Sequence, residues 1–175
     1  MQPNYRRFYT SRIFLLLALF ISICSQNSFA QDGSQPSSLS QLLPSYYSIK
    51  DALVNSDANA AASKAAEFAK IIKAVDMKTL PNSEMTVFMS LQDKLADDAT
   101  HIASNKDIKH QREHFATFSS NLFALAKGLK LNSKPVYYDY CPMKKAYWLS
   151  NEASIKNPYF GSAMLTCGKT TETLK

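Results

Sequence analysis

The sequence has 175 residues and a formal net charge of +6. Residues 1–30 contribute three arginines and no acidic residue, so the rest of the chain, with 17 basic and 14 acidic residues, carries only +3. Charges of mixed sign and this small excess offer no clustered basic face for a nucleic acid. The roughly 145 residues that follow residue 30 suffice for one domain that folds without disulfides.

The N-terminal segment has the three parts of a secretory signal peptide. Three arginines precede an apolar run over residues 13–23. The segment ends in Ser28-Phe29-Ala30, which places small residues at the two positions that a leader peptidase recognises. The apolar run is shorter than the roughly 20 residues of a membrane span. We therefore expect a signal peptide over residues 1–30, cleaved after Ala30, and a periplasmic or secreted protein. A lipoprotein anchored through Cys24 is the less favoured alternative, because Ile23 stands where such a signal requires a small residue.

Residues 31–38 form a polar segment that we expect to be a flexible linker, and residues 39–175 form the single predicted domain. Four stretches then carry apolar residues at helical spacing. In the second stretch steps of four and three alternate, which is typical of helices that pack in a bundle. Pro44 suits only the first turn of a helix, and Asp57 is the expected N-cap of the second helix. The four stripes are Leu39, Leu42, Tyr46, Ile49 and Leu53; Ala61, Ala65, Phe68, Ile72 and Val75; Met85, Phe88, Leu91, Leu95, Ala99 and Ile102; and Ile108, Phe115, Phe118, Leu122, Leu125 and Leu129.

Short breaks between these stretches favour antiparallel neighbours. Gly128 and Asn132 mark the expected end of the fourth helix. The predicted fold class is all-α, an antiparallel four-helix up-and-down bundle. Residues 131–175 lose the helical period, and although residues 136–140 have a strand-like composition, we expect this aromatic-rich Cys/Met segment to be mostly irregular. It should pack on the bundle and bury Trp148.

The Cys/Met segment holds soft sulfur atoms in mirror order, Cys141-x-Met143 and Met164-x-x-Cys167. Thiolates and thioethers together select Cu(I) over hard cations, so these four residues are the predicted metal ligands. A structural disulfide between Cys141 and Cys167 is the alternative, because it would close a loop of about 25 residues and stabilise the fold by roughly 3 to 4 kcal/mol.

Two histidines offer candidate additional metal ligands. His110 and His114 lie four residues apart, hence on one face of the predicted fourth helix, at a spacing that can hold a metal. Their charged neighbours are also typical of a solvated face. His101, late in the third helix, has no evident ligand partner in the sequence. We find no phosphate-binding loop, zinc-protease helix or nucleophile elbow, and predict no enzyme.

The chain also resembles a domain family of unknown function that occurs in exported bacterial proteins and appended to periplasmic adaptor (membrane fusion) subunits of heavy-metal efflux pumps. The resemblance extends over residues 39–172. It rests most on four segments of the tail, and less on residues 46–53 and on Gln111-Arg112 of the helices. The tail segments are residues 140–143 (YCPM), 147–150 (YWLS), 155–161 (IKNPYFG) and 164–168 (MLTCG). It implies a periplasmic role around copper or a similar soft metal, with heavy-metal efflux components as partners.

We therefore expect a periplasmic protein that binds or handles a soft metal of the copper type in heavy-metal efflux or homeostasis, without catalysis. Its cofactor would be Cu(I) or a similar soft ion, bound by Cys141, Met143, Met164 and Cys167. The alternative is a non-metal interaction or accessory module with a Cys141–Cys167 disulfide. Neither hypothesis includes a nucleic-acid partner or a transmembrane segment in the mature chain.

Overall fold

The computed structural model describes residues 37–175. The expected signal peptide, its cleavage after Ala30, the alternative anchor Cys24 and residues 31–36 of the expected linker lie outside the described residues. Within residues 37–175, none of the helices is both long enough and apolar enough to span a bilayer. Ser37 and Ser38 belong to the fold instead of the linker, because Ser37 caps the first described helix by accepting the Ser40 N–H at 3.3 Å.

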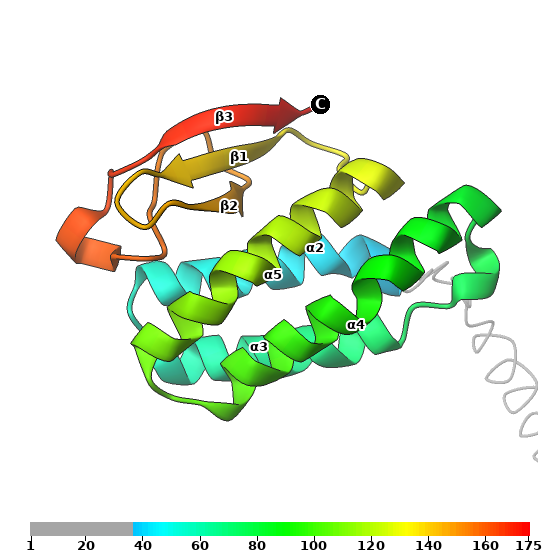
Figure 1. Cartoon of the computed structure of the whole chain (residues 1–175), viewed down its shortest axis with the longest axis horizontal. Coiled ribbons are helices and arrows are strands. Elements are labelled where there is room, and N and C mark those ends of the chain that lie inside the picture. The colour runs from blue at the N-terminus through cyan, green and yellow to red at the C-terminus, as the bar shows by residue number, and fades with distance from the viewer. Residues whose placement is uncertain (1–36) are drawn as a thin grey trace, which may run out of the picture. The chain divides into compact units, whose positions relative to one another are not determined.

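Four helices alternate in direction, and each packs against the next along the chain (Figure 1). Short connections of this kind favour antiparallel neighbours. The predicted four-helix bundle is confirmed. Its helices are α2 (Ser38–Val54), α3 (Ala58–Lys73), α4 (Asn82–Ser104) and α5 (Ile108–Leu129), with a 3-10 turn η1 (Met77–Thr79) between α3 and α4.

The predicted apolar stripes form the core of the bundle. Most of their residues are buried, among them Phe68, Phe88 and Phe115 at full burial. Each such aromatic side chain contributes roughly 1.5 to 3 kcal/mol through the apolar surface that it removes from water. Asp57 caps α3 as predicted, because its carboxylate accepts the Ala60 N–H at 2.9 Å.

One local prediction about the helices is wrong. Pro44 lies in the second turn of α2, since the helix begins at Ser38. A proline there removes only the hydrogen bond to the carbonyl of Ser40, an exposed residue near the helix end. The end of α5 lies between Gly128 and Asn132, as predicted, because the helix stops at Leu129. Gly128 itself is still helical, and a Cβ atom there would come within 2.8 Å of Val87 Cγ1 on α4. The helix ends through Lys130, which takes the left-handed conformation at φ 48°.

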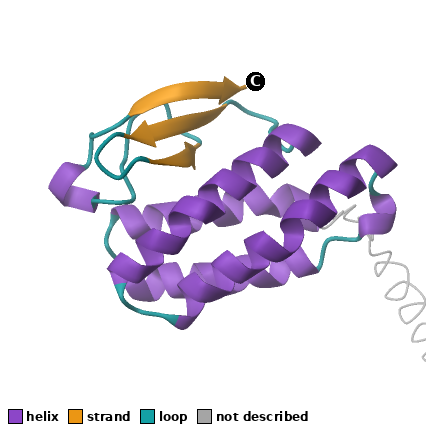
Figure 2. Ribbon diagram, in the orientation of Figure 1, coloured by secondary structure: helices purple, strands orange, loops and turns teal. Residues whose placement is uncertain are grey.

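The C-terminal part of the chain is a three-stranded antiparallel sheet of order β2-β1-β3 (Figure 2). The predicted all-α class and the mostly irregular tail are therefore wrong. The helical period could not reveal the sheet, because β1 pairs with β3 across a long stretch of chain, joining Tyr138 to Glu172. The strands are β1 (Val136–Cys141), β2 (Ala146–Ser150) and β3 (Lys169–Leu174), with a 3-10 turn η2 (Gly161–Met164) between β2 and β3.

The sheet covers the side of the bundle formed by α2 and α5 (Figure 1). Tyr46 of α2 fixes it there. The backbone N–H of Leu149 on β2 donates to the Tyr46 hydroxyl at 3.1 Å, and that hydroxyl lies 2.7 Å from Ser119 Oγ on α5. Ser119 donates its own proton to the Phe115 carbonyl at 2.7 Å, so Tyr46 is the donor to Ser119. One buried hydroxyl thus connects α2, α5 and β2.

Trp148 is fully buried in the sheet, as predicted. A Cβ atom at Gly168, just before β3, would lie 2.6 Å from Trp148 Cη2. The absence of a side chain at Gly168 therefore leaves room for the indole ring.

Candidate metal centre

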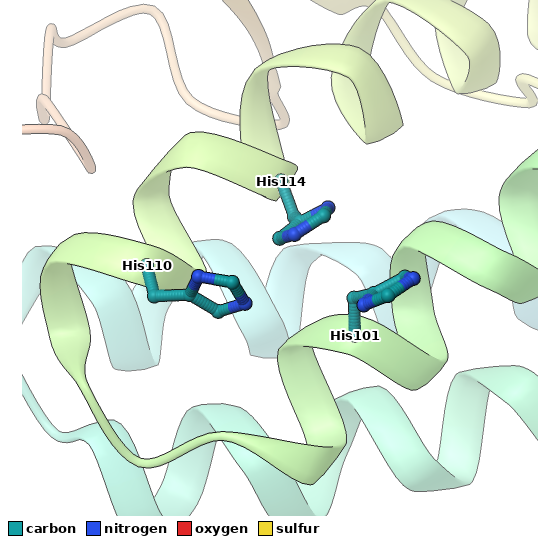
Figure 3. Close-up of side chains that lie close together, drawn as sticks. All are labelled: His101, His110 and His114. Carbon is teal, nitrogen blue, oxygen red and sulfur yellow. The ribbon is translucent and has the colours of Figure 1, made fainter.

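All three histidines of the chain gather where α4 turns into α5 (Figure 3). His101 lies near the end of α4, and His110 and His114 lie in the first turns of α5. One ring nitrogen from each lies within 4.8 Å of those of the other two. Every imidazole of the sequence therefore meets in one cluster, which we call the histidine cluster.

The connection between the two helices is held by a buried amide. Gln111 is fully buried, and its Nε2 lies 3.2 Å from the carbonyl oxygen of Ile102 and 2.7 Å from that of Asn105. The Asn105 side chain accepts the N–H of Asp107 at 2.8 Å, and the Asp107 carboxylate caps α5. The end of α4 is thus tied to the beginning of α5, which fixes the backbone that carries the three histidines.

The three rings are packed against one another. His101 and His114 stack nearly parallel, with centroids 4.5 Å apart and an interplanar angle of 3°. His110 meets His114 edge-on at 4.7 Å and 62°. His101 is exposed, while His110 and His114 are partly buried, so the cluster opens to solvent on the His101 side.

A shared metal ion requires a modest rearrangement of these rings. Zinc binds imidazole nitrogen at about 2.0 to 2.1 Å in a tetrahedron, which places the nitrogens roughly 3.3 to 3.4 Å apart. The nitrogens lie within 4.8 Å of each other, so rotations about side-chain torsions must bring them closer by at most roughly 1.5 Å. Parallel stacked rings also direct their nitrogens along similar lines, so His101 or His114 must turn. Three ligands then leave the fourth position open.

The two thiols of the Cys/Met segment lie in contact near the end of β1. Cys141 is fully buried and Cys167 is partly buried, and both are free. The amide Nδ2 of buried Asn157 donates to Cys141 Sγ at 3.2 Å and to the Cys167 carbonyl oxygen at 2.6 Å. Burial, followed by the adjacent Cys141 thiol, raises the pKa of the Cys167 thiol above its ordinary value. The raised pKa favours the neutral thiol form of Cys167.

The two methionines are much more exposed than the thiols. Met143 is 63% exposed in the turn after β1, and Met164 is 39% exposed in η2. The backbone links Met164 to the thiol pair, because the Cys167 N–H donates to the Met164 carbonyl at 3.1 Å. The structure thus brings the two cysteines together, whereas convergence of all four sulfur atoms stays a prediction. The disulfide between Cys141 and Cys167 stays a prediction as well.

The sequence interpretation of His101 is wrong, since its ring stacks on His114. Two antiparallel helices bring together residues at equal distances from the turn that joins them. His101 and His110 are equally far from the middle of residues 104–107. This symmetry predicts that His101 lies near His110, provided that the break between the two helices is recognised in the sequence.

The chain belongs to the family described as a protein of unknown function, DUF3347, whose model matches residues 42–134. This segment is more than half of the chain and includes all three histidines. The matched segment ends before the Cys/Met segment, whose motifs are the main basis of the resemblance over residues 39–172. No curated protein and no solved structure gives a significant match to the chain.

Proposed function

We propose that this member of the DUF3347 family binds a borderline divalent transition-metal ion, of the Cu(II) or Zn(II) kind, at His101, His110 and His114. The observation that carries the proposal is the convergence of every histidine in the sequence on one cluster. Structural packing alone gives no reason for this, because a partly exposed cluster of imidazoles contributes little to the core. Imidazole is a preferred ligand of copper, zinc and nickel.

The chemistry of the cluster favours metal handling over a permanent structural site. Structural zinc sites close all four positions with protein ligands, whereas three ligands leave one position for exchange. The exposed ring of His101 keeps that position reachable from solvent. We propose that the protein acts in metal homeostasis or efflux outside the cytoplasm, a location supported by the signal-peptide pattern of residues 1–30.

The direct test is metal titration of protein produced without an affinity tag of histidines. Zn(II) and Cu(II) compete with a chromophoric chelator at micromolar concentration, and one ion should bind per chain. Single His→Gln substitutions at positions 101, 110 and 114 should each weaken binding, because each removes a ligand. Cys141→Ser with Cys167→Ser is the matched control and should retain the histidine site. Wild-type protein that fails to compete, or His→Gln variants that bind unchanged, would contradict the proposal.

A second candidate function is Cu(I) binding at Cys141 and Cys167 with Met143 and Met164. The observation that favours it is the contact between the two thiols. Metal binding would have to displace the thiol protons. The competing account is an accessory module with a Cys141–Cys167 disulfide, which predicts no free thiols in protein isolated from the periplasm and lower stability after reduction.

Thiol counting followed by anaerobic Cu(I) titration separates these two accounts. The reduced protein should bind one Cu(I), and Met143→Leu with Met164→Leu should weaken binding without unfolding the protein, because the two residue types are close in volume. Absence of competition for Cu(I) at micromolar chelator would reject the sulfur site and leave the histidine proposal intact.

A further inference from the structure

We propose that Asp98 is a positioning residue of the histidine cluster. It holds a proton on Nδ1 of His114 and so presents Nε2 of that ring to the metal. This inference rests on the metal-binding function proposed above, and it identifies the ligand whose coordinating nitrogen is chosen before the ion arrives.

Asp98 lies on α4 one turn before His101, and it faces α5. His114 Nδ1 lies 3.6 Å from Asp98 Oδ1. The same carboxylate accepts a hydrogen bond from Thr117 Oγ1 at 2.8 Å and a longer one from Asn121 Nδ2 at 3.4 Å. His114, Thr117 and Asn121 follow one face of α5 at helical spacing. The carboxylate is therefore anchored by two side chains while it faces the third.

The chemistry of the pair decides the tautomer of His114. An ionised carboxylate only accepts hydrogen bonds, and a neutral imidazole carries one proton on either Nδ1 or Nε2. The nitrogen that faces Asp98 therefore holds the proton, and the lone pair lies on Nε2. Metal-bound histidines usually donate their second N–H to such a carboxylate, which orients the ring and strengthens it as a ligand.

The distance of 3.6 Å is longer than a full N–H···O hydrogen bond of roughly 2.7 to 3.2 Å. The rings must also turn for three nitrogens to approach one ion. Both requirements concern the same torsions of His114. Rotation that leaves the stack with His101 and shortens the contact to Asp98 prepares the ring for coordination.

His114 is the one member of the cluster with this support. Among residues 37–175, no hydrogen bond is found between a ring nitrogen of His101 or His110 and another protein group. His114 is thus the ligand whose tautomer is set by a neighbouring carboxylate. The neighbouring Asp97 provides a matched control, because it is exposed while Asp98 is only 15% exposed.

The test compares Asp98→Asn with Asp97→Asn in the untagged chain. Zn(II) affinity, measured by chelator competition, should fall about 10- to 100-fold in Asp98→Asn with the stoichiometry unchanged. Asp97→Asn should bind like the wild type. Thr117→Val, which removes one anchor of the carboxylate, should give a smaller loss in the same direction. Thermal unfolding of the metal-free variants shows whether each is folded.

A second measurement distinguishes positioning from a merely structural role. Nitrogen-15 chemical shifts of the metal-free protein, above the pH at which imidazole titrates, should place the proton of His114 on Nδ1. In Asp98→Asn the population should move toward Nε2–H. A wild-type His114 with its proton on Nε2, or an Asp98→Asn variant with wild-type zinc affinity, overturns the role of Asp98 alone. Wild-type protein that binds no zinc overturns the proposed function itself.

Discussion

At the level of single residues, Tyr46 is important for the fold because its hydroxyl connects two helices and a strand. Tyr46→Phe would leave the Leu149 N–H without its acceptor and remove the donor to Ser119 Oγ. Unsatisfied buried polar groups of this kind cost about 1 to 3 kcal/mol. We expect urea unfolding to report a loss of that size. Tyr47→Phe is the control, since no hydrogen bond of the Tyr47 hydroxyl is found in residues 37–175, and equal stability of both variants would contradict the assignment.

Buried tyrosines also predict how stability depends on pH at the alkaline end. Burial raises the pKa of Tyr47 to about 12, and burial likewise raises the pKa of Tyr138. The folded state therefore keeps protons that the unfolded chain releases near pH 10. Stability should be fully present below pH 10 and decline as the pH rises toward 12. Chemical unfolding at pH 9 and 11 measures the decline, which Tyr47→Phe should reduce. A pH-independent midpoint across this interval would refute the prediction.

The helices pack closely enough that one added methyl group matters. Gly128→Ala would raise the helix propensity of α5 by about 1 kcal/mol, yet its Cβ would lie 2.8 Å from Val87 Cγ1. Overpacking typically costs 1 to 3 kcal/mol, so we expect net destabilisation or at best no gain. Val87→Ala in the same chain removes the clash and should make the substitution stabilising. The double-mutant cycle measures the coupling, and additive effects would show that α4 and α5 do not meet at this point.

The elements differ in how far their sequences specify them. The helices could be predicted because their signals are local: stripes at helical spacing, the Asp57 cap, and breaks near residues 81 and 105. Only β1 of the sheet could be predicted from its composition. The sequence of β3 is polar, with Lys and Thr residues, and its pairing with β1 depends on contacts between distant parts of the chain. The histidine cluster could be predicted in part, for His110 and His114 share a helix, whereas His101 and Asp98 reach it across an interface between helices.

For the whole molecule, metal binding should couple to folding. The proposed site joins α4 to α5, so an ion that binds only the folded chain stabilises it by about 2.7 kcal/mol when its free concentration is 100 times its dissociation constant. For a chain of this size we expect the unfolding temperature to rise by roughly 5 to 10 °C. Differential scanning calorimetry with and without Zn(II) measures the shift, and excess chelator should reverse it. His114→Gln should show little shift, and an equal rise in that variant would place the ion elsewhere.

The single tryptophan gives the protein an optical signal of its own. Trp148 is buried within the sheet beside Gly168, so its fluorescence reports whether the sheet stays docked, while far-ultraviolet ellipticity mainly follows the helices. The two signals thus follow different parts of one chain. Because the Tyr46 hydroxyl joins these parts, both denaturation curves should coincide, as they do for a single cooperative unit. Fluorescence that changes at lower denaturant would instead reveal a sheet that detaches from an intact bundle.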